Sequence, residues 1–257
     1  MTLLMLAPRI NETGLQLLTR ARRRGLRAHT AVRWEVPAEL AGLRPAHLYG
    51  GPLFADVAAG PLGVVPLEPP ADWLTTLPAE LLSRRVECTT LAEARRLRRP
   101  AFLKPPVDKL FPARVHPDGS GLPGPDALDD DTPVLVSDVV AFASEYRLFV
   151  LDGEVRAASR YAVAGSLAVS PEVGPDVLAF AADVLAAGGL PSAAVVDVGP
   201  LSDGTWAVVE ANPAWASGGY ACDPDQVLDV VLRAAGPADA LAPTDLGYAR
   251  PVPEVVR

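Results

Sequence analysis

Two short valine-rich runs near the C-terminal end, residues 193–198 and 206–211, restrict the possible folds most strongly. Both have the length and composition of buried β-strands, yet the first carries Asp197 and the second carries Glu210. A carboxylate in an apolar strand is costly to bury unless a metal ion or a basic group compensates its charge. The two runs therefore predict a β-sheet with a cation site built into it.

Asn212 adds an amide to this pair of acids. It lies two positions after Glu210, so both side chains point to the same face of an extended strand. Carboxylate and amide oxygens suit Mg²⁺, which keeps several waters and relies on nucleotide phosphates for further ligands. The alternative is an acid at a strand end followed by an Asn-Pro turn, and these residues taken alone leave both interpretations open.

A lysine ends another short apolar run, residues 101–105. At the end of a buried strand, the Lys104 ammonium group is well placed for a phosphate oxygen. The alternative is a lysine whose stem packs on apolar surface while its charge reaches water. The sequence has no GxxxxGK(S/T) loop and no GxGxxG after an early strand, so it favours neither a P-loop NTPase nor a Rossmann fold.

Two strand-like runs flank Asp152 and Gly153 and predict a hairpin, because Asp-Gly supplies the positive φ of a tight I′ turn. Glu145 and Arg147 would share one face of the first strand, with Arg160 on its partner. Two neighbouring arginines are suited to hold a transferring phosphoryl group and a developing oxyanion. The alternative is a cross-strand ion pair on an exposed face.

The chain divides into a small α/β domain over 1–88, a main domain over 89–235 and a Pro-rich tail over 236–257. Prolines between Pro61 and Pro78 exclude a regular helix there. The hydrophobic spacing predicts these elements of the first domain: a strand over 2–7, a helix over 11–25 and strands over 27–34 and 47–49. In the main domain it predicts helices over 91–98, 175–187 and 224–235.

Charge and cysteine content narrow the partners. A formal net charge of −8 disfavours nucleic acid, because phosphate binding requires clustered basic residues. Two arginine-rich stretches, 20–27 and 95–99, have apolar residues at helical spacing and predict solvated helix faces. Cys88 and Cys222 form neither a disulfide framework nor a CxxC metal site, which favours a cytoplasmic location. No apolar run approaches the ~20 residues needed to span a bilayer, so we expect no membrane partner.

Taken in order, these pieces resemble the ATP-grasp superfamily, and more narrowly its arginine-plus-two-lysines clade. The resemblance rests on residues 102–105, 134–142, 145–150, 159–161, 196–199 and 209–213, and in the first domain on 47–50, 69–74 and 85–86. It implies an ATP-grasp fold, in which a preface domain precedes two lobes that clasp ATP between antiparallel sheets. ATP and Mg²⁺ are the implied cofactors. The loop after Lys104 departs from the family pattern, because Pro105 and Pro106 stand where many members have glycines that cover the phosphates. In this chain Lys109 would take the place of that glycine-rich cover.

The resemblance also implies a role for each candidate residue. For the nucleotide, Lys104 and Lys109 would contact phosphates, the backbone of Val136, Ser137, Asp138 and Val139 would read adenine, and Glu145 would hold the ribose hydroxyls. For the metal, the ligands would be Asp197, Glu210 and Asn212. For catalysis, Arg160 and Arg147 would stabilise the acyl-phosphate and the tetrahedral intermediate.

The implied activity is ATP-dependent formation of an amide from a carboxylate and an amine, carried by small molecules or peptides. A non-catalytic ATP-binding module and a phosphotransferase without ligation stay open as alternatives. Phosphoryl transfer requires positioning and charge neutralisation rather than a protein nucleophile, so we interpret Cys222 as a buried structural thiol. A homodimer is compatible with this scheme, and the sequence names no substrate.

Overall fold

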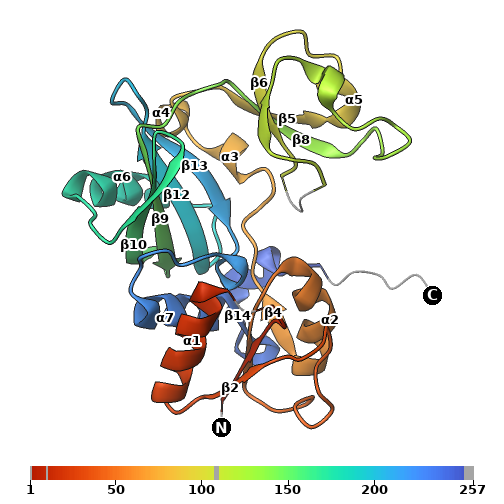
Figure 1. The fold of residues 1–257 in the computed structure, drawn as a ribbon, viewed down its shortest axis with the longest axis vertical. Helices are drawn as coiled ribbons and strands as arrows, with labels where there is room; N and C mark the ends of the chain where they lie inside the picture. Colours follow the sequence, from red (N-terminus) through yellow and green to blue (C-terminus); the bar gives the residue numbers. More distant parts are fainter. Residues whose placement is uncertain (1, 10, 107–109, 252–257) are drawn as a thin grey trace.

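The computed structural model describes residues 2–9, 11–106 and 110–251. Its strands form a three-stranded, a five-stranded and a four-stranded sheet together with a small two-stranded one. Figure 1 shows the three larger sheets as bodies placed one above another along the long axis, with the N-terminal body at the bottom. The mixed α/β fold with antiparallel lobes predicted from the sequence is confirmed.

The N-terminal body is a parallel sheet in the order β2-β1-β3. Its strands and helices are β1 (Leu3–Leu6), α1 (Glu12–Arg23), β2 (Arg27–Thr30), β3 (Ala46–Tyr49) and α2 (Pro52–Leu62). Helix α1 begins at Asn11, whose side chain accepts a hydrogen bond from the Gly14 N–H at 2.7 Å. The predicted strands and helix are present, whereas α2 was not expected. Pro61 lies inside the helix, where it removes one i→i−4 hydrogen bond, and the helix ends at the next residue, Leu62.

The uppermost body is an antiparallel sheet in the order β5-β8-β6-β7, and it carries Lys104 at the end of β6. Its elements are β5 (Val86–Thr90), α5 (Leu91–Ala94), β6 (Ala101–Lys104), β7 (Arg114–His116), the 3-10 turn η1 (Gly119–Gly121) and β8 (Pro133–Ser137). Helix α5 starts with a capping box between Thr90 and Glu93. It ends after one turn, at Ala94, instead of continuing to residue 98 as predicted.

The central body is an antiparallel sheet in the order β11-β10-β9-β12-β13. Its strands are β9 (Ser144–Leu151), β10 (Glu154–Val163), β11 (Ser166–Ser170), β12 (Ala193–Pro200) and β13 (Trp206–Asn212). Asp152 and Gly153, with φ of 51° and 79°, make the predicted tight turn between β9 and β10.

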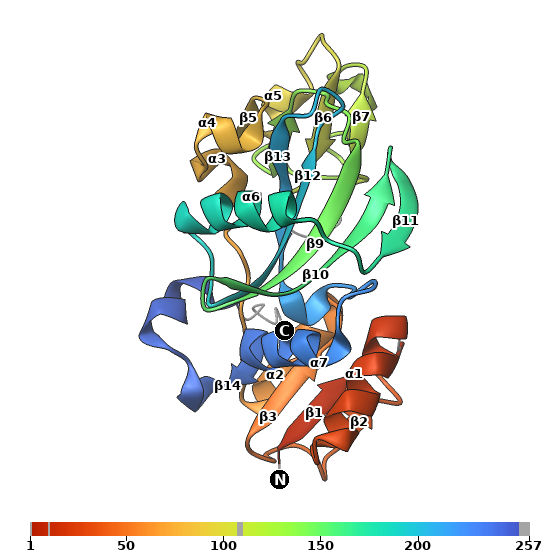
Figure 2. The same cartoon turned by 90° about the vertical axis from the view of Figure 1, so that its left-hand side faces the viewer.

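The two faces of this central sheet pack against different partners. Figure 2 shows α6 (Pro175–Ala186) lying across one face, where α3 (Trp73–Thr76) and α4 (Ala79–Leu82) also pack. Leu148 and Val150 of β9 point to that face, whereas Phe149 points to the opposite one and joins the core around α7 (Pro224–Ala234). The neighbour of Phe149 on that second face is Arg147, which places the candidate site on the side of α7 and the N-terminal body.

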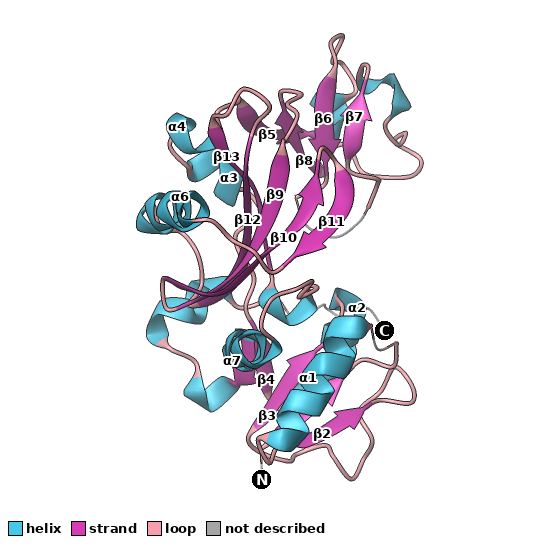
Figure 3. Ribbon diagram, turned by 60° about the vertical axis from the view of Figure 1, so that its left-hand side comes forward, coloured by secondary structure: helices cyan, strands magenta, loops and turns pink. Residues whose placement is uncertain are grey.

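Residues 236–251, the described part of the predicted tail, pack against the N-terminal body. Strand β14 (Ala235–Pro237) pairs with β4 (Val64–Pro66), and the 3-10 turns η3 (Ala238–Ala240) and η4 (Pro243–Tyr248) follow it. Arg250 then forms ion pairs with Asp56 and Glu68 at 2.8 and 2.6 Å. Helix α7 lies beside α1 in Figure 3 and shares one hydrophobic core with β1 and β3. The hydrophobic core of the N-terminal body is therefore completed by residues from the far end of the chain.

Candidate active site

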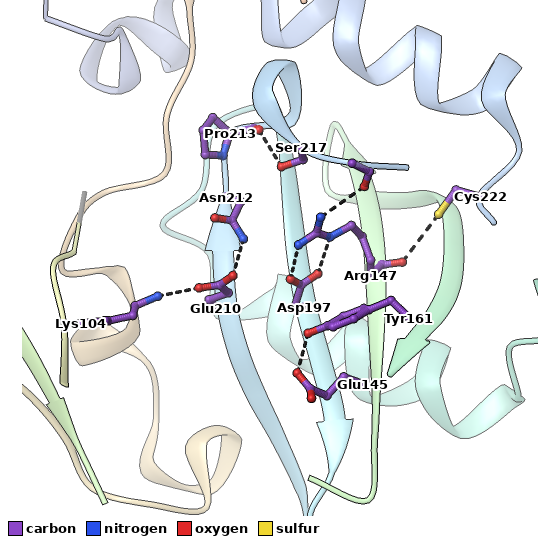
Figure 4. A network of polar contacts seen from close by, with 11 residues as sticks. Lys104, Glu145, Arg147, Tyr161, Asp197, Glu210, Asn212, Pro213, Ser217 and Cys222 are labelled. Carbon is purple, nitrogen blue, oxygen red and sulfur yellow. Dashed lines mark hydrogen bonds and ion pairs between the residues drawn. The ribbon is translucent and has the colours of Figure 1, made fainter. Parts of the chain in front are cut away.

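A row of four charged side chains crosses from the central sheet to the uppermost one. Arg147 on β9, Asp197 on β12 and Glu210 on β13 are register partners on adjacent strands. Lys104 reaches them from the end of β6, and its Nζ lies 2.6 Å from Oε2 of Glu210 (Figure 4). The order of charges along the row is therefore cation, anion, anion and cation.

Arg147 and Asp197 form the buried end of this row. The guanidinium donates through Nε at 2.9 Å and through Nη2 at 2.6 Å to the two carboxylate oxygens, which is a bidentate pair. The Asp197 side chain is 1% exposed and that of Arg147 is 11% exposed. Burial raises the pKa of Asp197 to about 6, although the ion pair with Arg147 acts in the opposite direction. Asp197 is therefore ionised at neutral pH.

Glu210 occupies the accessible end. Besides Lys104, it accepts a hydrogen bond from the Asn212 side-chain amide at 2.8 Å. Burial opposes ionisation here too, but Lys104 and Asn212 outweigh it, so the pKa of Glu210 is lowered. Two acids opposite each other on adjacent strands repel, and the two flanking cations compensate that repulsion. The cluster is electrically balanced as it stands.

The expected metal ligands fall together in this cluster. Asp197 and Glu210 face one another across the strand pair, and Asn212 bonds to Glu210 through its amide nitrogen, which leaves its oxygen as a potential ligand. Within the described ranges, no three His, Cys, Asp or Glu side chains gather in a geometry that would hold a metal ion. The donor set is therefore two carboxylates and an amide oxygen, which fits Mg²⁺ completed by phosphate and water oxygens.

Two tyrosines, Tyr161 and Tyr220, cover Arg147. The rings of Tyr161 and Tyr220 stack at a centroid distance of 5.0 Å, and the guanidinium carbon lies 5.6 and 5.1 Å from their centroids. The Tyr161 hydroxyl donates to Glu145 at 2.6 Å. Burial, and then the nearby carboxylates, raise the pKa of Tyr161, so this hydroxyl stays a donor. Glu145, predicted to hold ribose, is thereby fixed beside the charged row.

Cys222 lies behind the same arginine, as Figure 4 shows. Its Sγ is 3.3 Å from the Ser159 hydroxyl and 3.9 Å from the Arg147 carbonyl oxygen. Burial raises the pKa of the thiol to about 11. A thiol that is buried and protonated at neutral pH packs against the site and does not act as a nucleophile.

The segment predicted to read adenine begins inside the uppermost sheet. Val136 and Ser137 lie on β8, between β5 and β6, so their backbone takes part in strand pairing. The Asp138 N–H donates to the Arg85 carbonyl at 3.0 Å, whereas Val139 beyond the strand is 48% exposed. Of the four predicted residues, Val139 is the most exposed.

Arg84 is a further residue of this region that sequence reasoning missed. Its guanidinium donates to Ser137 Oγ at 3.0 Å and to the Val208 and Val209 carbonyls at 2.7 and 3.3 Å. Desolvation lowers its pKa to about 10. Arg84 thus ties the metal strand β13 to the end of β8. Nothing in the sequence distinguishes it from its exposed neighbour Arg85.

Two predicted residues are not joined to the row. The only described hydrogen bond of the Arg160 side chain goes to the Ala168 carbonyl of β11 at 3.2 Å, within a region where the β9–β10 register shifts. In the β9–β10 register Arg160 pairs with Tyr146 and Arg147 pairs with Ser159, so the two arginines do not lie directly opposite each other. Lys109 lies outside the described residues.

The two antiparallel sheets, bridged by Lys104 and Glu210, form the two-lobed arrangement expected of an ATP-grasp fold. The family model of the ATP-grasp domain, family 2 of the arginine-plus-two-lysines clade, matches residues 81–230, and the chain belongs to this family. The sequence-based resemblance is confirmed. No curated protein matches the chain.

Solved structures share the fold at low identity. The RimK domain ATP-grasp protein of Sphaerobacter thermophilus has 19% identity and a TM-score of 0.54, with 90% of this chain and 100% of that chain covered. The D-cycloserine synthetase DcsG has 15% identity and a TM-score of 0.56, with 89% and 98% covered. The D-alanine–D-alanine ligase of Bacillus anthracis has 15% identity and a TM-score of 0.55, with 91% and 96% covered.

Among the described residues, no helix is long and apolar enough to cross a membrane.

Proposed function

We propose that the chain is an ATP-dependent ligase that joins a carboxylate to an amine through an acyl-phosphate. The observation that carries the proposal is the balanced charged row, in which Lys104 of one sheet reaches Glu210 of the other. Such a junction provides a cation for phosphate and oxygen ligands for a metal in one place. Two structural neighbours are named as a ligase and a synthetase, in agreement with this activity.

ATP would bind between the two sheets. Lys104 contacts the α- and β-phosphates, Lys109 covers them, and Glu145 holds the ribose hydroxyls. The backbone of Val139, beyond the paired end of β8, reads adenine. Arg84 supports this pocket indirectly, because it bonds both to Ser137 and to the carbonyls of β13.

Asp197, Glu210 and Asn212 would hold Mg²⁺. When bound, the metal neutralises phosphate charge and draws the transferring group into line. The protein residues do the remaining work. Arg147 keeps Asp197 ionised and fixed, since both carboxylate oxygens are already bonded in a buried position.

The proposed reaction has two steps. A substrate carboxylate oxygen attacks the γ-phosphorus and ADP leaves, which gives the acyl-phosphate. The amine then attacks the carbonyl carbon, phosphate leaves with the C–O bond electrons, and the amine loses a proton to solvent. Arg160 and Arg147 would stabilise the negative charge that builds up on the acyl-phosphate and on the tetrahedral intermediate.

Trapping of the intermediate tests this proposal. The chain is incubated with ATP, Mg²⁺, hydroxylamine and a panel of small acids, amino acids and peptides, and hydroxamate, ADP and phosphate are measured. Ligation predicts hydroxamate that depends on ATP and on one class of acid. ADP formation with a stable phosphorylated product would indicate a phosphotransferase, and ATP binding without ADP would indicate a binding module. Either outcome would overturn the proposal.

Glu210→Gln supplies the residue-specific test. It should lower Mg-dependent turnover by about a hundredfold or more, because metal stabilisation is worth several kcal/mol. Glu154→Gln is the matched control, since Glu154 is exposed at the start of β10. Normal turnover in Glu210→Gln would exclude the metal assignment.

A further inference from the structure

A cavity of about 60 Å³ lies in the N-terminal body. It is lined among others by Ala7 after β1, by Tyr49 at the end of β3 and by Gly50 and Gly51 beyond it. The carboxyl ends of these parallel strands point toward the central sheet (Figure 3). The chain leaves β1 for β2 on one side, whereas β3 lies on the other side of β1. A crevice at such a switch point is where open parallel sheets bind ligands.

The charge of the cavity selects an anion. Among the described residues that line it, Arg9 is the one charged side chain, and no acid is present, although the whole chain carries a net charge of −8. Asn11 also lines it and uses its side-chain oxygen to accept the Gly14 N–H, so its amide nitrogen remains a donor. A guanidinium and neutral donors without an acid match a carboxylate.

One short segment forms a wall of the cavity and also contacts the candidate active site. Ala216 lines the cavity, and the carbonyl of the next residue, Ser217, accepts a hydrogen bond from the Tyr49 hydroxyl at 3.0 Å. The Gly218 carbonyl accepts a hydrogen bond from Arg147 at 3.2 Å. A ligand held in the cavity therefore lies within two residues of the backbone that contacts the charged row.

We propose that this cavity anchors the carboxylate of an amino acid, or of a short peptide C-terminus, that serves as the amine substrate. This inference rests on the ligase activity proposed above. A cavity of this size holds a carboxylate, and we place the rest of the substrate toward Ser217 and Gly218, whose carbonyls accept hydrogen bonds from Tyr49 and Arg147. Because the cavity lacks an acid, the amino group is not held there and remains free to attack an activated carbonyl beside Arg147.

Replacement of Arg9 gives the first test. Amino acids and dipeptides are compared with their carboxamides as amine substrates in ATP-dependent phosphate release. Arg9→Ala should raise the KM for the carboxylates by about tenfold or more, the worth of a charge-assisted hydrogen bond. The KM for ATP and the kcat should change little. Arg27→Ala is the matched control, because Arg27 is exposed at the opposite end of the same sheet.

Gly51 offers a second variant that keeps Arg9. A side chain at Gly51 would meet no atom within 4 Å, and its φ of −77° suits any residue, so Gly51→Leu should fold and narrow the cavity. It should raise the same KM. Equal use of acids and carboxamides by the unaltered chain, or an unchanged KM in both variants, would overturn the proposal.

Direct binding separates this inference from the proposed activity. Alanine and alaninamide are titrated into the isotope-labelled chain without ATP, and the amide resonances of Gly14, Gly50 and Gly51 are followed. Shifts produced by alanine and not by alaninamide, and lost in Arg9→Ala, support the cavity even if no turnover is found. Shifts by both compounds, or by neither, contradict it even if the ligase activity is established.

Discussion

The Arg147–Asp197 pair makes the sharpest prediction, because its contribution to stability can be measured apart from its contribution to activity. Asp197→Asn keeps the size of the side chain but removes its charge, and the amide can accept only one of the two guanidinium bonds. Loss of one partner from a buried ion pair costs ~3–5 kcal/mol. Glu210 also lies near Arg147 and offsets part of this loss. We therefore expect about 3 kcal/mol, near the lower limit of that range.

A double-mutant cycle isolates the pair. Asp197→Asn, Arg147→Met and the double variant are unfolded in urea at about pH 8, where Asp197 is ionised in the folded chain. The coupling energy should be about 2–3 kcal/mol, as for directly bonded charged residues. A coupling energy below about 0.5 kcal/mol would refute the interpretation of this contact as a true buried ion pair.

The pH dependence of Arg147→Met provides a second check. A carboxyl whose folded pKa lies above its unfolded value destabilises the fold when ionised, and the penalty disappears as the pH falls through the folded pKa. Asp197 has a raised pKa of about 6 with Arg147 present, and removal of the arginine should raise it further. Arg147→Met should thus lose less stability at about pH 5 than at about pH 8. The opposite trend would show that Asp197 is not desolvated.

Three further outcomes follow from the structure. Iodoacetamide at about pH 8 should label exposed Cys88 and spare buried Cys222. The pKa of Cys222, about 11, leaves on the order of a thousandth of this thiol as thiolate, and equal labelling of both cysteines would contradict the burial of Cys222. Lys104→Met should weaken ATP binding by about tenfold or more, measured by calorimetry, and unchanged affinity would exclude its phosphate role. Arg250→Ala should lower the free energy of unfolding in urea by about 1–3 kcal/mol, because the variant loses two ion pairs and the contact of the guanidinium with the Trp215 ring. An unchanged free energy of unfolding would show that these contacts do not stabilise the fold.

The sequence predicted those parts of the site that follow from strand periodicity. Asp197, Glu210 and Asn212 fall together because alternation on a strand and pairing of consecutive strands are local consequences of the sequence. The hairpin at Asp152 and Gly153 was equally predictable from its turn chemistry. Local patterns of this kind need no knowledge of which distant elements meet.

The parts that the sequence did not reveal depend on contacts between distant segments. Arg147 is bonded to Asp197, fifty residues away, and no spacing rule distinguishes that partner from a phosphate. Arg84 bonds to carbonyls of β13 across more than a hundred residues. The Pro-rich end of the chain has the composition of a tail, yet it pairs through β14 because β4 would otherwise leave backbone groups unsatisfied.

The balance of charge in the row suggests how the site accepts ATP under the proposed function. Lys104 is bonded to Glu210 in the structure, and the proposed role of each requires a different partner. A triphosphate that takes Lys104 leaves the Glu210 carboxylate without its cation, next to Asp197, whose charge is still balanced by Arg147. A divalent cation then restores the balance at that point. Binding of nucleotide and of Mg²⁺ should therefore be coupled, with each tightening the other by the same factor. Arg147 keeps its partner throughout, so the coupling passes through Glu210.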